Sequence, residues 1–96
     1  MLIPAICTWE LSLLALRGRV PLSQPVPAVF AELLEEPRVS LHPLTPQIGY
    51  RAAQLSPSQP MDPADQFIAA TALVLDAPLV TSDERLQHIP GLRILW

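Results

Sequence analysis

The segment from Phe67 to Leu75 constrains the fold of this 96-residue chain most strongly, because nearly every residue in it is apolar. It follows Asp62-Pro63-Ala64-Asp65, in which an acid, a proline and a second acid occupy positions that favour a helix start. A helix without a polar face is covered by other elements on all sides. We therefore predict a buried helix that begins near residue 63.

Around this helix, short apolar runs alternate with segments of helical periodicity. We predict strands near residues 3–6, 39–44, 79–81 and 92–95, and further helices over residues 8–17, 25–36, 45–55 and 82–87. Thr8 and Thr45 are placed to cap two of these helices, and Gly18 is placed to close the first. Strands separated by helices indicate an α/β fold with a largely parallel sheet in a single domain over residues 1–96.

The composition excludes several classes of protein. Half of the residues are apolar and 16% are charged, which excludes a disordered chain. No apolar run reaches the ~18 residues of a membrane span. The N-terminal apolar stretch lacks the basic flank of a secretory signal, and the single cysteine, Cys7, cannot form an internal disulfide. We therefore expect a cytoplasmic protein with no membrane segment.

The charge of the chain limits how it could bind nucleic acid. The net charge is −3, all six cations are arginines, and there is no lysine. A basic stripe that grips a phosphate backbone by charge alone is therefore absent. If nucleic acid is the partner, another group must supply the positive charge.

Five of the nine carboxylates fall at or near the predicted starts of helices: Glu10, Asp62, Asp65, Asp83 and Glu84. In parallel α/β sheets the helix starts gather at the carboxyl edge of the strands, where ligands usually bind. Three or four converging carboxylates could hold Mg²⁺ or Mn²⁺, which prefer oxygen ligands. The same positions also suit plain helix capping, with Asp62 as an N-cap and Thr81 opening a capping box. Spacing leaves both interpretations open.

Three strings in the chain resemble the PIN-domain family, in particular its VapC-type toxins. The strings are Thr8-Trp9-Glu10, the segment from Met61 to Leu73, and Leu79-Val80-Thr81-Ser82-Asp83-Glu84-Arg85-Leu86. The resemblance implies a PIN-like three-layer α/β fold with a mainly parallel sheet. It also implies a Mg²⁺- or Mn²⁺-dependent endoribonuclease that cleaves RNA, forms homodimers and is neutralised by a cognate antitoxin.

The resemblance also assigns roles to individual residues. Glu10, Asp65 and Asp83 match the family's acidic metal ligands and catalytic residues. Asp62 and Thr81 are expected to cap helices or to support the ligands from behind. Arg85, two residues after Asp83, is the cation placed best to meet a substrate phosphate.

The chain departs from the family pattern at its start. PIN domains begin with a central strand that ends in an aspartate, and the present sequence begins at what resembles the second strand, so we expect one metal ligand and the central strand to be missing. This leaves two alternatives to the nuclease. One is a non-catalytic PIN-like module that only binds an antitoxin or a partner protomer. The other is an α/β domain that binds a small molecule in the same crevice.

Overall fold

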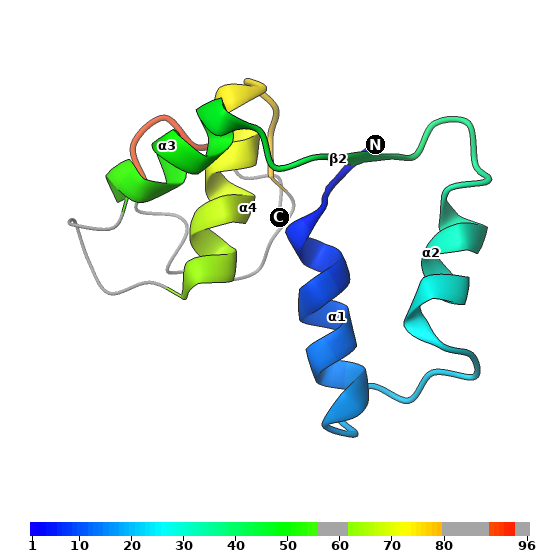
Figure 1. The fold of residues 1–96 in the computed structure, drawn as a ribbon. Coiled ribbons are helices and arrows are strands. Elements are labelled where there is room, and N and C mark those ends of the chain that lie inside the picture. The colour runs from blue at the N-terminus through cyan, green and yellow to red at the C-terminus, as the bar shows by residue number, and fades with distance from the viewer. Residues whose placement is uncertain (56–61, 80–88, 94–96) are drawn as a thin grey trace. The chain divides into compact units, whose positions relative to one another are not determined.

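The computed structural model describes residues 1–55, 62–79 and 89–93 of the chain (Figure 1). They belong to two compact units, Met1–Pro43 and Leu44–Trp96. The helix predicted over residues 82–87 lies outside the described residues, as do residues 80–81 and 94–95 of the strands predicted at 79–81 and 92–95. The single domain over residues 1–96 stays a prediction.

The first unit contains a parallel pair of short strands, β1 (Leu2–Pro4) and β2 (Ser40–His42). The amide of Ala5 donates to the carbonyl of His42 at 2.8 Å, which extends the pairing past the end of β1. Parallel strands need a long crossover connection, and two helices supply it. The predicted α/β class is thus confirmed.

Helix α1 (Ile6–Leu16) begins earlier than predicted. Ala5 already has helical backbone angles and provides no side-chain cap. Thr8 lies inside the first turn, where its hydroxyl donates to the carbonyl of Ala5 at 2.7 Å. The prediction that Thr8 caps this helix is therefore wrong, because the chain passes from β1 into the helix directly at Ala5.

The other end of α1 agrees with the sequence. Gly18 has a φ of +70°, and its amide donates to the carbonyl of Ala15 at 3.1 Å. The amide of Arg19 donates to the carbonyl of Leu14 at 2.9 Å. These two bonds form a Schellman motif, in which glycine adopts the left-handed conformation without a steric penalty.

Helix α2 (Val26–Leu33) returns beside α1 in the opposite direction (Figure 1). Its predicted place is confirmed, although the regular helix ends three residues before the predicted residue 36. Phe30 is the one buried side chain in residues 1–43. The larger apolar side chains of this unit that remain exposed are Met1, Leu2, Trp9, Leu14, Leu16, Leu33, Leu34 and Leu41.

The second unit is built on two packed helices, α3 (Pro46–Leu55) and α4 (Pro63–Val74). Thr45 caps α3 as predicted, since its hydroxyl oxygen accepts from the amide of Ile48 at 3.3 Å. The core contains Ile48, Ala52, Leu55, Ala69, Ala70 and Ile89. Small alanines on the inner side of α4 therefore let α3 approach closely.

Helix α4 is less completely covered than its sequence predicts. Ala64 and residues 69–72 are buried, but Phe67 and Leu73 are half-buried and Val74 is 40% exposed. The cover lies on the alanine side, where α3 packs. After α4, the amide of Leu79 donates to the carbonyl of Arg93 at 2.7 Å and joins two segments that were predicted to be strands.

The helices that the structure describes are short. The longest, α4, has 12 residues. Among residues 1–55, 62–79 and 89–93, no helix has the length and apolarity that crossing a membrane requires.

Candidate functional site

Glu10 lies in the middle of α1 and is half-buried. Because the helix begins at Ile6, Glu10 is beyond the first turn, contrary to the sequence-based placement at a helix start. The helix dipole acts mainly within the first turn. A favourable interaction with the helix start therefore does not explain an acid at this position.

The charge of Glu10 acts on Cys7, one turn earlier on the same helix. Residues three apart on a helix are neighbours on its surface. Burial, and secondly the negative charge of Glu10, raise the pKa of the Cys7 thiol. Cys7 is therefore a protonated, half-buried thiol and not an activated nucleophile.

The start of α4 resolves the role of Asp62. Asp62 has extended backbone angles, and its carboxylate accepts from the amide of Ala64 at 3.0 Å. Pro63 follows at the first helical position, where its missing N–H costs no hydrogen bond. The capping role predicted for Asp62 is thus confirmed.

Asp65 lies in the first turn of α4 and is half-buried. The N-cap position is already filled by Asp62, so Asp65 is not the residue that begins the helix. The next residue, Gln66, donates from its side-chain amide to the carbonyl of Ala52 at 3.1 Å. This bond fixes the first turn of α4, and Asp65 with it, against α3.

The structure therefore places Asp62 and Asp65 together at the start of α4. Glu10 belongs to the first compact unit and Asp65 to the second. Thr81, Asp83 and Arg85 lie outside the described residues. In the part of the chain that is described, no three His, Cys, Asp or Glu side chains are grouped so that they could hold a metal ion. The convergence of Glu10, Asp65 and Asp83 stays a prediction.

The donor chemistry of these residues fits a hard divalent cation. Glu10 and Asp65 offer carboxylate oxygens, which Mg²⁺ and Mn²⁺ prefer over nitrogen or sulfur. Both acids are half-buried on helices, which restricts their side chains more than a loop would.

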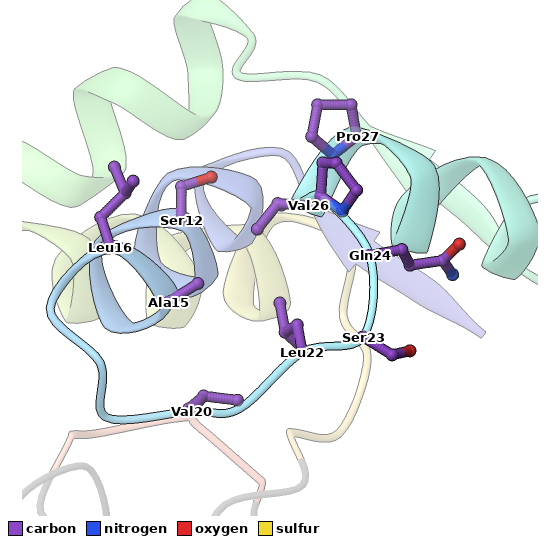
Figure 2. A pocket seen from close by; sticks show the side chains of 10 residues that line it. Ser12, Ala15, Leu16, Val20, Leu22, Ser23, Gln24, Val26 and Pro27 are labelled. Carbon is purple, nitrogen blue, oxygen red and sulfur yellow. The ribbon is translucent and has the colours of Figure 1, made fainter.

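Sequence reasoning missed a cavity in the first unit. It has a volume of about 560 Å³ and lies between the end of α1, the following loop and the start of α2 (Figure 2). Its apolar lining includes Leu16, Leu22 and Val26. The sequence does show apolar residues spaced through the proline-rich segment between the two helices. They can be identified as the lining of a cavity only after the helices have been placed.

Two polar side chains of this cavity, Ser12 and Gln24, form hydrogen bonds with other residues. The hydroxyl of Ser12 donates to the carbonyl of Thr8 at 2.6 Å, and the side-chain amide of Gln24 donates to Glu32 at 2.9 Å. The lining is mostly apolar and contains no carboxylate, imidazole, thiol or cationic side chain that could activate a serine hydroxyl. We do not place catalytic chemistry there.

Comparisons with known proteins agree with the motifs. The profile of the PIN domain matches residues 1–92. The chain is 39% identical over 85 residues to Ribonuclease VapC22 of Mycobacterium tuberculosis (strain ATCC 25618 / H37Rv). The match covers 88% of this chain and 64% of the relative. No solved structure matches the chain.

Proposed function

Since the chain belongs to the PIN-domain family, we propose that it carries the activity of a VapC-type endoribonuclease, which cleaves RNA with the help of Mg²⁺ or Mn²⁺. The observation that supports this most is the 39% identity to Ribonuclease VapC22, which extends over 88% of the chain. The match to the PIN-domain profile, over residues 1–92, includes all three strings that hold Glu10, Asp65 and Asp83.

In this proposal Glu10, Asp65 and Asp83 hold the divalent ion through their carboxylates. Asp62 already provides the N-cap oxygen of α4, so Asp65 is not the capping residue, which supports a ligand role for its carboxylate. Thr81 is proposed to support the segment that carries Asp83. Arg85 is proposed to contact a phosphate of the substrate, as a planar guanidinium can do in a bidentate manner.

The charge of the chain favours a role for a cation. With six arginines, no lysine and a net charge of −3, the protein has little positive charge to attract RNA. A bound divalent ion supplies positive charge for the phosphate and makes water a better nucleophile. The carboxylates orient the ion, and one of them can accept the proton that the attacking water loses.

Partners and location follow from the same resemblance. We propose an antitoxin protein that neutralises the nuclease, self-association as a homodimer, and action on RNA in the cytoplasm. The exposed apolar side chains of the first unit, such as Leu16 and Leu33, are compatible with protein partners.

An RNA-cleavage assay on the full chain with Mg²⁺ or Mn²⁺ tests the nuclease. Asp65→Asn, Asp83→Asn and Glu10→Gln should each reduce cleavage by more than about a hundredfold, since changes merely around metal ligands already cost 10- to 100-fold. Asp62→Asn is the matched control, because asparagine caps helices as well as aspartate does and should leave cleavage unchanged. Mn²⁺ binding, measured by calorimetry, should be lost in Asp65→Asn and kept in Asp62→Asn.

Two outcomes would contradict this proposal. If Asp65→Asn cleaves RNA as the unmodified chain does, the carboxylates are not the ligands. If the unmodified chain neither cleaves RNA nor binds Mn²⁺ more tightly than millimolar, the nuclease proposal fails, and the non-catalytic module that binds an antitoxin or a partner protomer replaces it.

A further inference from the structure

A second hollow of the first unit lies on the C-terminal half of α2. It has a volume of about 450 Å³ and is lined by Val29, Glu32, Leu33, Glu36 and Val39. We call these five residues the acidic groove. Its apolar members offer surface that a partner could bury, since Leu33 is 42% exposed, while the two glutamates supply negative charge.

The surroundings of the acidic groove compensate its negative charge only in part. Residues 20–37 contain three glutamates and no arginine or lysine. Among the described residues, Arg38 pairs with Glu36 at 3.2 Å while its side chain remains 88% exposed, and the N-terminal ammonium of Met1 donates to the main-chain carbonyl of Arg38. Glu32 accepts a hydrogen bond from Gln24, which brings no charge. An occupant with apolar and cationic groups would therefore match the groove.

The same chain contains such a segment directly after α1. Leu16 is 86% exposed, and Arg17 and Arg19 are also exposed. The Schellman closure at Gly18 fixes the backbone of both arginines. We call residues 16–19 the basic corner. Within the described residues neither arginine forms an ion pair, so the cations of the corner have no acidic partner in that part of the chain.

The two surfaces lie toward opposite ends of the helix pair. Helices α1 and α2 are antiparallel, so the basic corner lies at the loop end and the acidic groove toward the strand end (Figure 1). A twofold axis perpendicular to both helices would place the corner of each chain in the groove of the other. Such an interface is closed and uses each surface once, as in most homodimers.

We propose that a second copy of this chain occupies the acidic groove, with Leu16 contacting Leu33 and with Arg17 and Arg19 facing Glu32 and Glu36, in two symmetric contacts. The inference names a surface for the self-association that was proposed above. It does not depend on nuclease chemistry.

Charge reversal tests this pairing in the full chain. Arg17→Glu with Arg19→Glu makes the corner acidic, and Glu32→Arg with Glu36→Arg makes the groove basic. Each double variant alone should dissociate at least about tenfold more readily than the unmodified chain, because like charges then face each other. An equimolar mixture of the two double variants should form a heterodimer, because both of its contacts again pair opposite charges.

The measurement is molar mass by sedimentation equilibrium at low salt, repeated at about 1 M salt, where charges are screened within ~3 Å and the dimer should weaken. Arg51→Glu on α3 controls for the chemistry of the substitution, since it makes at one site the change from arginine to glutamate that the corner variant makes at two, and it should leave the dimer intact. Dimerisation of the mixture also demonstrates that both double variants fold.

Three results would overturn the inference: an unmodified chain that stays monomeric at low salt, double variants that dimerise as the unmodified chain does, or a mixture that remains monomeric. If the chain stays monomeric and its acidic groove binds only an unrelated basic protein, the inference is likewise overturned. Because the readout is mass and not RNA cleavage, such a failure would leave the nuclease proposal standing.

Discussion

Replacing Asp76 with glycine is expected to raise the melting temperature of this chain. Asp76 follows α4 with a φ of +50°, in the left-handed region. Its amide donates to the carbonyl of Leu73 at 3.2 Å, and the amide of Ala77 donates to the carbonyl of Ala72 at 2.9 Å. This is a Schellman closure, which glycine makes without strain, whereas a residue with a Cβ atom loses about 1 kcal/mol there.

The charge of Asp76 adds to this penalty. A carboxylate at a helix C-terminus opposes the helix dipole at a cost of about 0.3–1 kcal/mol. The compensation is small, because the Arg93 guanidinium lies 3.4 Å from the carboxylate and the two side chains are 58% and 95% exposed. Solvent screens such a pair to about 0.5 kcal/mol or less. Arg93 also donates to the main-chain oxygen of Asp76, and glycine keeps that bond.

The balance favours Asp76→Gly by about 1 kcal/mol, which corresponds to about 4–8 °C in a domain of this size. Thermal unfolding followed by far-ultraviolet circular dichroism measures it. Asp76→Ala is the matched control, because it removes the same charge and ion pair but keeps a Cβ atom in the left-handed conformation; it should melt below the glycine variant. The reasoning is refuted if Asp76→Gly melts at or below the unmodified chain, or if the alanine variant melts as high as the glycine variant.

Three further predictions concern the core, the cap and the thiol. Ile48 is 1% exposed, and Ile48→Ala should lower the free energy of unfolding in urea by about 2–5 kcal/mol. Tyr50 on the same helix is 71% exposed, and Tyr50→Ala should change that free energy by less than about 0.5 kcal/mol. Equal effects of the two substitutions would contradict the described core. Asp62→Ala removes the N-cap hydrogen bond and should lower the free energy of unfolding by about 1 kcal/mol, whereas Asp62→Ser keeps a capping oxygen and should lose little stability. An alanine variant as stable as the serine variant would show that the cap contributes nothing. Burial and the charge of Glu10 raise the pKa of Cys7, so the folded chain holds the thiol proton more tightly than the unfolded chain, and stability should fall as the pH rises through the usual range of a thiol. Glu10→Gln should reduce that fall and Cys7→Ser should abolish it, and an unchanged pH dependence in both variants would refute the assignment.

The parts of the fold that sequence predicts correctly are those that depend on local hydrogen bonds. Gly18, Thr45 and Asp62 each close or open a helix where their residue types lead one to expect it, because each acts within three or four residues. Thr8 fails for a non-local reason. The pairing of Ala5 with His42 continues β1 to the residue where α1 begins, and no property of Thr8 records that contact.

In the candidate site, too, the sequence predicts local contacts but not contacts between distant parts of the chain. Capping by Asp62 is a local property of the start of α4, and sequence alone predicts it. The predicted approach of Glu10 to Asp65 would not be local, because one acid belongs to the first compact unit and the other to the second. The acidic groove is also invisible in the sequence, since Val39 joins it only after the chain has turned back from α2 toward β2.

Glu10 and Asp65 lie at different distances from the starts of their helices, so the helix dipole acts differently on the two carboxylates. The start of α4 favours a negative charge at Asp65 through the helix dipole, but the middle of α1 gives Glu10 no such compensation. The charge of Glu10 is instead felt by Cys7, whose pKa it helps to raise.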